Sequence, residues 1–238
     1  MILVLLVAPL GDYLPKAAMA GVLFLVAWGL VDFEEIKRIL HSSGREASVL
    51  AVTFFAAVVV DLEFAIFAGV LLSLLLYLER ASRPRIVTRT PDARLPDRAF
   101  SGDPELPQCP QLRFVRIDGS LFFGAVNHVQ HVFERLHTEH QTQKHLALVA
   151  TGMNFIDFSG AKAIEHEAHR RRNEGGDLYL IKVKDGVWDM LDNSGCLDDK
   201  QARNTFANKE AAIHGIYQKL DKSVCAKCTR RIFLECAS

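Results

Sequence analysis

Three cysteines near the C-terminus have the spacing that most clearly suggests chemistry. Cys225 and Cys228 form a Cys-x-x-Cys pair, and Cys236 follows eight residues later. Such a pair can hold zinc through its thiolates, or it can cycle between dithiol and disulfide. A structural zinc site needs a fourth ligand, for which the candidates are Cys109, Cys196 and His214. Zinc binding, redox chemistry and three unligated reduced thiols all remain open.

A second candidate is the segment Asp157-Phe158-Ser159-Gly160, which stands before a helical pattern. Its carboxylate or hydroxyl can accept hydrogen bonds from the free N–H groups at the start of that helix. The same N–H groups can instead bind a phosphate or a nucleotide. We favour plain capping by Asp157 and Ser159; the alternative role of the loop is an exposed apolar contact of Phe158 with a partner.

Other features exclude whole classes of function. The sequence has no P-loop, no Gly-x-Ser-x-Gly and no paired nucleophile and base, so nothing in it predicts an enzyme. The formal net charge is zero, so the chain lacks the global positive field typical of proteins that bind nucleic acid. We therefore expect no nucleic-acid partner and, apart from zinc at the tail, no cofactor.

Strands and helices alternate in the half of the chain that carries these candidates. The predicted strands are residues 112–117, 146–150 and 178–183. Apolar residues at helical spacing predict helices around residues 125–136, 161–168, 187–191 and 213–220. This order predicts a soluble α/β domain with a parallel or mixed sheet and helices packed on it.

The first half of the chain is typical of membrane protein. Four apolar stretches occupy residues 1–10, 17–31, 47–60 and 64–78, each shorter than the roughly 20 residues of a full span. We interpret the last two as a hairpin, because one long helix would place Asp61 and Glu63 near its middle. At the turn these acids are solvated caps or, less simply, ligands of a proton or an ion.

Arginines follow the last apolar stretch and give the chain its orientation. They are Arg80, Arg83, Arg85, Arg89, Arg94 and Arg98. Clustered positive charge beyond a span marks the cytoplasmic side, so the α/β domain is predicted to be cytoplasmic. The N-terminus is apolar from Met1 and has no signal-peptide features, so we interpret Met1 as lying inside a longer membrane protein.

Two motifs of the α/β half resemble a STAS domain, the module shared by sulfate transporters and anti-sigma-factor antagonists. They are IDGSLFFG at residues 117–124 and FIDFSG at residues 155–160. The upstream sequences WGLVDF at 28–33, VDLE at 60–63 and GVLLS at 69–73 are similar to the last transmembrane helices of the SulP anion transporters.

This resemblance implies the C-terminal part of a secondary active inorganic anion transporter of the sulfate type. Gate helices would occupy residues 1–79, a juxtamembrane linker or lead-in strand 80–110, a regulatory or dimerisation STAS domain 111–222, and a Cys-rich tail 223–238. The anion-binding helices would precede this chain, so no substrate-binding residue is assigned to it. In the antagonists the loop reads Asp-Ser-Ser-Gly and its first serine is phosphorylated; here Phe158 stands at that position.

The resemblance also implies partners and a location. We expect a homodimer in the lipid bilayer of the bacterial inner membrane, passing an inorganic anion through the missing core helices. The alternative is a freestanding, membrane-anchored STAS protein that binds a signalling partner and transports nothing.

Overall fold

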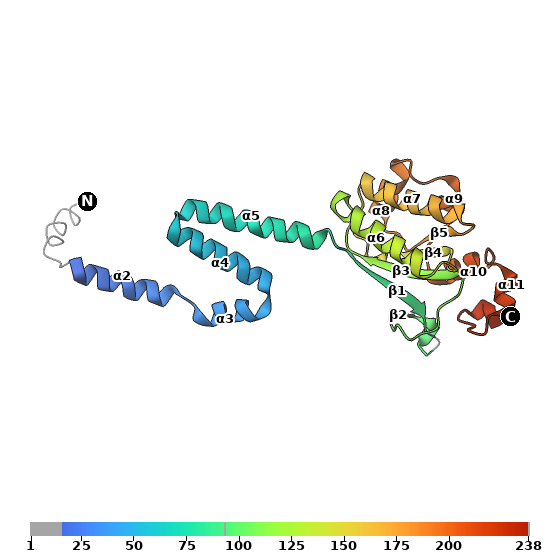
Figure 1. Ribbon diagram of the computed structural model, residues 1–238, viewed down its shortest axis with the longest axis horizontal. Helices are drawn as coiled ribbons and strands as arrows, with labels where there is room; N and C mark the ends of the chain where they lie inside the picture. The colour runs from blue at the N-terminus through green and yellow to red at the C-terminus, as the bar shows by residue number, and fades with distance from the viewer. Residues whose placement is uncertain (1–15, 93, 238) are drawn as a thin grey trace. The chain divides into compact units, whose positions relative to one another are not determined.

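The computed structural model describes residues 16–92 and 94–237 and divides the chain into two units, Met1–Leu76 and Tyr77–Ser238 (Figure 1). The apolar stretch predicted at residues 1–10 lies outside the described residues. Each unit is described by itself below.

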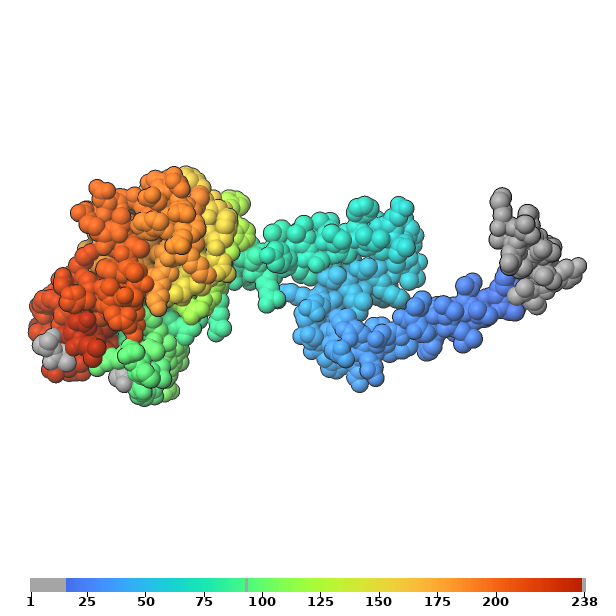
Figure 2. All heavy atoms as spheres, turned by 180° about the vertical axis from the view of Figure 1, so that it is seen from behind, coloured from blue at the N-terminus to red at the C-terminus, as the bar shows by residue number. Residues whose placement is uncertain are grey.

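The first unit consists of helices whose apolar side chains are exposed. They are α2 (Lys16–Leu30), α3 (Phe33–Ser42), α4 (Gly44–Val59) and α5 (Leu62–Ala81), which continues into the second unit. Most side chains along them are exposed, as Figure 2 also shows, and α2, α3 and α4 bury none of their residues. Exposed apolar surface on this scale requires lipid or further protein to cover it.

One of these helices could cross a membrane alone. Within the described residues, the 20-residue α5 is long and apolar enough, while α2 and α3 would qualify only as one bent span. The 16-residue α4 is too short by the same measure. Helix α3 lies in a segment for which no helix is predicted; the Asp32 carboxylate caps it by accepting a hydrogen bond of 3.0 Å from the Glu35 N–H.

The predicted hairpin is confirmed at α4 and α5. The chain breaks at Val60 and Asp61, and the Asp61 carboxylate accepts a hydrogen bond of 2.6 Å from the Phe64 N–H at the start of α5. The two helices approach each other at one point farther along, where a Cβ at Gly69 would lie 2.5 Å from the Thr53 hydroxyl oxygen. Asp61 therefore acts as a helix cap at the turn.

The second unit is built on a six-stranded mixed sheet in the order β2-β1-β3-β4-β5-β6 (Figure 1). Its strands are β1 (Arg85–Pro91), β2 (Phe100–Ser101), β3 (Leu112–Asp118), β4 (His145–Val149), β5 (Asp177–Ile181) and β6 (Thr205–Phe206). Strand β1 is antiparallel to both β2 and β3, and β3 to β6 run parallel. The predicted mixed sheet and its three central strands are confirmed.

Helices cover both faces of this sheet. On one face lie α6 (Phe123–Glu139), α7 (Phe158–Asn173) and α8 (Asp185–Asn193), and near the β5–β6 edge the short α9 (Asp199–Arg203). On the other lie α10 (Lys209–Tyr217), α11 (Lys222–Lys227) and the segment that follows. Side chains alternate along each strand, so Leu146 and Leu148 pack under α6 to α8 whereas Ala147 and Val149 face α10.

The segment 80–110, predicted as a juxtamembrane linker or lead-in strand, contains a regular strand of the sheet. Arg85–Pro91 forms β1, which pairs with β3 from Arg85 opposite Asp118 to Arg89 opposite Phe114. Pro84 precedes the strand and Pro91 is its last residue, so neither proline interrupts the pairing with β3. The α/β domain therefore begins near residue 85 rather than at residue 111.

The Cys-rich tail predicted at residues 223–238 is likewise part of the domain. Ile232 and Phe233 are buried in the second core, and the Phe233 ring lies 6.0 Å from the Phe114 ring, centroid to centroid. The Arg98 guanidinium donates a hydrogen bond of 2.6 Å to the Ile232 carbonyl. Residues near the C-terminus thus complete the covering of the sheet.

This packing predicts that alanine substitutions at two neighbouring residues of the tail have very different effects on the free energy of unfolding. Replacing the buried Phe233 by alanine opens a cavity against Phe114 and should lower the free energy of unfolding by about 3 kcal/mol. Leu234→Ala, at a side chain that is 69% exposed, is the matched control and should change it by less than about 0.5 kcal/mol. Guanidinium unfolding of the chain in detergent measures both, and equal stabilities of the two variants would contradict the packing.

Candidate functional site

Two loops of the α/β unit run side by side and bring the starts of α6 and α7 together. The Gly119 N–H donates to the Gly152 carbonyl at 3.0 Å, and the Leu121 N–H donates to the Phe155 carbonyl at 2.9 Å. The Asp157 N–H returns a bond of 3.2 Å to the Leu121 carbonyl. The loop after β3 and the loop after β4 are therefore joined before either helix begins.

The Asp157 carboxylate caps both helices at once. One oxygen accepts a hydrogen bond of 2.8 Å from the Gly160 N–H in the first turn of α7. The other accepts a bond of 2.9 Å from the Phe123 N–H at the start of α6. Helix starts leave N–H groups unpaired, and one side chain here satisfies a group on each helix. The capping interpretation is confirmed for Asp157, and Ser159 lies inside the helix instead.

Gly160 is required by the close approach of α7 to the preceding loop. A Cβ at this position would lie 2.2 Å from the Leu121 carbonyl oxygen and 2.8 Å from the Ile156 side chain. Gly160 is buried, and neither the loop backbone nor the packed side chain leaves room for a larger residue. Only glycine fits at position 160 without a shift of the loop.

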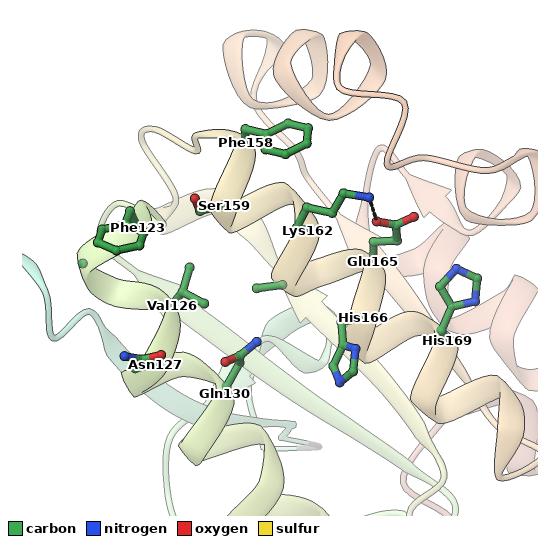
Figure 3. Close-up of a pocket in the computed structure, with 12 residues that line it drawn as sticks. Phe123, Val126, Asn127, Gln130, Phe158, Ser159, Lys162, Glu165, His166 and His169 are labelled. Atoms are coloured by element: carbon green, nitrogen blue, oxygen red, sulfur yellow. Dashed lines mark hydrogen bonds and ion pairs between the residues drawn. The ribbon is translucent and has the colours of Figure 1, made fainter.

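A groove of about 630 Å³ runs between α6 and α7 from this joint (Figure 3). Helix α6 lines it with Phe123, Gly124, Val126, Asn127 and Gln130, and α7 with Phe158, Ser159, Lys162, Ala163, Glu165, His166 and His169. The groove is open to the surface, and two of the four residues of the predicted loop, Phe158 and Ser159, line it.

The side chains of the groove are suited to recognition. Phe123 is 78% exposed and Phe158 is 53% exposed. The Lys162 ammonium lies 5.8 Å from the Phe158 ring centroid and 2.8 Å from the Glu165 carboxylate, whose hydrogen bond raises the pKa of Lys162. In the described part of the chain no base is hydrogen-bonded to the Ser159 hydroxyl, so the groove offers aromatic and charged contacts rather than an activated nucleophile.

The sequence predicts the loop of this site but not the rest of the groove. Asn127, Gln130, His166 and His169 line it from two helices that are far apart in the sequence. One feature of the sequence could have indicated the groove. Phe123 and Phe158 are aromatic residues at helix starts, where polar residues are usual.

The tail cysteines lie elsewhere, and none lines the groove. The Cys225 sulfur accepts a hydrogen bond of 3.4 Å from the Gln111 amide, and burial raises the pKa of both Cys225 and Cys109. Reactive thiols have lowered pKa values, so these surroundings do not activate either cysteine. Across residues 16–92 and 94–237 no three His, Cys, Asp or Glu side chains are grouped to hold a metal ion. Zinc binding and redox chemistry at Cys225, Cys228 and Cys236 stay predictions.

The fold and the joined loops define a class of domain. Residues 103–212 match the family model of the STAS domain, a range that contains β3 to β6, α6 to α9 and the Asp157–Gly160 loop. This part of the chain is therefore a STAS domain, as the two motifs predict.

The whole chain has relatives among sulfate transporters. It is 26% identical over 216 residues to the protein named "Putative sulfate transporter YvdB" of Bacillus subtilis (strain 168), covering 90% of this chain and 38% of that protein. It is 21% identical over 218 residues to Sulfate transporter 1.1 of Arabidopsis thaliana, covering 87% of this chain and 33% of that protein. The chain is a homologue of the SulP/SLC26 sulfate transporters and spans 38% and 33% of the length of these two relatives.

A solved structure has the same fold. The murine Slc26a9 anion transporter in the inward-facing state superposes with a TM-score of 0.71 at 17% identity, covering 82% of this chain and 32% of that one. At this identity the likeness concerns the fold alone. The superposed part covers 82% of this chain, whereas the second unit makes up only about two thirds of it. The likeness therefore includes helices of the first unit as well as the STAS domain.

The double cap gives a prediction about stability. Asp157→Ala removes acceptors from two helix starts and should cost about 1–2 kcal/mol of the free energy of unfolding. Asp157→Asn keeps one carbonyl oxygen as an acceptor, so it should lower the free energy of unfolding by less than Asp157→Ala does. Asp189→Ala removes an exposed aspartate of α8 and is the control. Denaturant unfolding ranks the three; an Asp157→Ala variant as stable as the control would refute the role of the cap.

Proposed function

We propose that this chain is the C-terminal part of a secondary active transporter of inorganic anions, with sulfate as the first substrate to test. Its helices would belong to the gate half of the membrane domain, and the anion would bind in helices that precede this chain. Alternating access of the two halves would carry the anion across the bilayer. The observation that carries the proposal is the homology to sulfate transporters over 90% of the chain, in the helices as well as in the STAS domain.

The pattern of charge and hydropathy supports the membrane part. Helix α5 is apolar over the length of a span, and Arg80 and Arg83 follow at its end. Under the positive-inside rule this end faces the cytoplasm, and the STAS domain with it. In a bacterial cell the membrane would be the inner membrane, and two copies would form a homodimer.

The α6/α7 groove supports a regulatory role for the STAS domain. Its exposed Phe123 and Phe158, with Lys162 beside them, offer contacts of the kind that dominate protein interfaces. At the position where anti-sigma antagonists carry the phosphorylated serine, Phe158 has no hydroxyl. Regulation through this loop would therefore depend on contact and not on phosphate transfer to residue 158.

Uptake of radiolabelled sulfate tests the transport proposal. The chain alone and the longer protein encoded by the upstream sequence in the same frame are expressed in a host that lacks its own sulfate uptake. We expect uptake from the longer protein only, because the chain alone has no anion-binding helices. An in-frame stop immediately upstream, or a longer protein that carries no inorganic anion tested, would refute it. The freestanding membrane-anchored STAS protein would then be the better hypothesis.

Orientation is tested separately with a membrane-impermeant maleimide on intact spheroplasts. In a variant with all five native cysteines replaced by serine, a cysteine introduced by Glu63→Cys at the α4–α5 turn should be labelled from outside. Cys228 retained alone should react only after lysis. Labelling of Cys228 before lysis would place the STAS domain outside and contradict the proposed orientation.

A further inference from the structure

A second cavity, of about 350 Å³, lies on the sheet face opposite the α6/α7 groove. Its floor is a row across three strands, in which Arg116 of β3, Val149 of β4 and Ile181 of β5 are paired neighbours. Val149 and Ile181 are the last residues of their strands. The cavity therefore lies at the carboxyl ends of the parallel strands, where open α/β sheets commonly bind ligands.

Positive charge dominates the lining of this cavity. Arg89, Arg116, Lys182 and Lys209 line it, against one acidic residue, Glu210. Two of these cations have protein partners: Arg116 lies 2.6 Å from the Asp118 carboxylate, and Lys209 lies 3.2 Å from the Glu210 carboxylate. Lys209 also donates to the backbone carbonyls of Asp97 and Arg98.

The other two cations are Arg89 and Lys182. Within the described residues no carboxylate or hydrogen-bond acceptor contacts the Arg89 side chain, whereas Lys182 is exposed and acts electrostatically on the Glu210 carboxylate. The Arg89 Nε is buried and has no hydrogen-bond partner. A buried N–H of a charged group without an acceptor is costly, so this atom indicates a missing anionic partner. Room for the guanidinium is kept by Gly102, where a Cβ would lie 2.9 Å from the Arg89 Nη1.

The backbone of Lys182 adopts an unusual conformation. Its φ of 54° lies in the left-handed region, which a side chain with a Cβ rarely adopts. The strained residue directly follows β5 and lines the cavity. Strain of this kind is characteristic of ligand-binding positions, where surrounding structure holds a side chain in a required place.

The uncharged part of the cavity limits the kind of ligand. Phe100, Val149 and Ile181 give it an apolar wall beside the cations. A group that carries both negative charge and a flat or apolar part would use both surfaces. The volume suits a small molecule and is too small for a folded partner.

We propose that this cavity is a binding site for a tetrahedral oxyanion, either free or carried by a small organic molecule. Arg89 would bind the oxyanion as the cation without a protein partner, with Lys182 and Arg116 beside it. Phe100 and Ile181 would contact the organic part when one is present. This proposal concerns the STAS domain alone and does not depend on transport by the protein.

Calorimetric titration of the chain in detergent at constant ionic strength tests the site, with inorganic phosphate and phenyl phosphate as probes. We expect saturable binding of one anion per chain. Phenyl phosphate binding roughly tenfold more tightly than phosphate would assign an organic ligand, since its ring buries apolar surface. Equal affinities would assign the free anion. No saturable binding of either probe would refute the site.

Two variants test whether the anion binds in this cavity or is only attracted by positive charge on the surface of the domain. Arg89→Gln should weaken binding at least about tenfold, because it removes a charge-assisted contact. Arg135→Gln removes an exposed cation of α6 on the opposite face and should leave binding unchanged. Equal losses in these two variants would overturn the proposal.

A third variant, Lys182→Gly, distinguishes ligand binding from a structural role. Glycine adopts a positive φ without strain, so stability should be unchanged or higher while anion affinity falls several-fold. A variant that binds phosphate as tightly as the original chain would remove Lys182 from the site.

Discussion

The central strands of the STAS domain are apolar on both faces, and this constraint determines how the rest of the domain is built. Leu146 and Leu148 point to one face of β4, and Ala147 and Val149 to the other. Two separate layers must therefore cover the sheet. Helices α6, α7 and α8 form the first layer, and α10 with the residues around Phe233 forms the second.

The two layers leave two different openings. Between α6 and α7 the joint at Asp157 holds the helix starts together, and the groove beyond it exposes aromatic side chains. On the other face the second layer stops short of the carboxyl ends of β4 and β5, and basic residues surround the gap. One domain thus presents a surface suited to a protein partner and a cavity suited to a small anion, with the sheet between them.

The sequence was sufficient for the regular elements and for the class of domain. Strong apolar periodicity marked β3, β4, β5, α6 and α7, and the Asp157–Gly160 loop was found from its own residues. Strand β1 was left open between a lead-in strand and a linker, because its proline-rich surroundings are typical of linkers and its pairing with β3 depends on residues far along the chain. The basic cavity was not predicted for the same reason, since Arg89 and Arg116 come from separate strands, Lys182 follows a third, and only the register of the sheet brings them together. Long-range pairing of this kind leaves no local pattern.

The contacts between Arg98 and Ile232 join segments 134 residues apart and have a consequence for synthesis on the ribosome. The apolar helices are made first and can enter a membrane while translation continues. Phe114 on the second face lacks its Phe233 contact until the residues around Phe233 have been made. A nascent chain that stalls before residue 232 would therefore hold inserted helices beside an unfinished domain with aromatic surface exposed, a form that cellular quality control is equipped to remove.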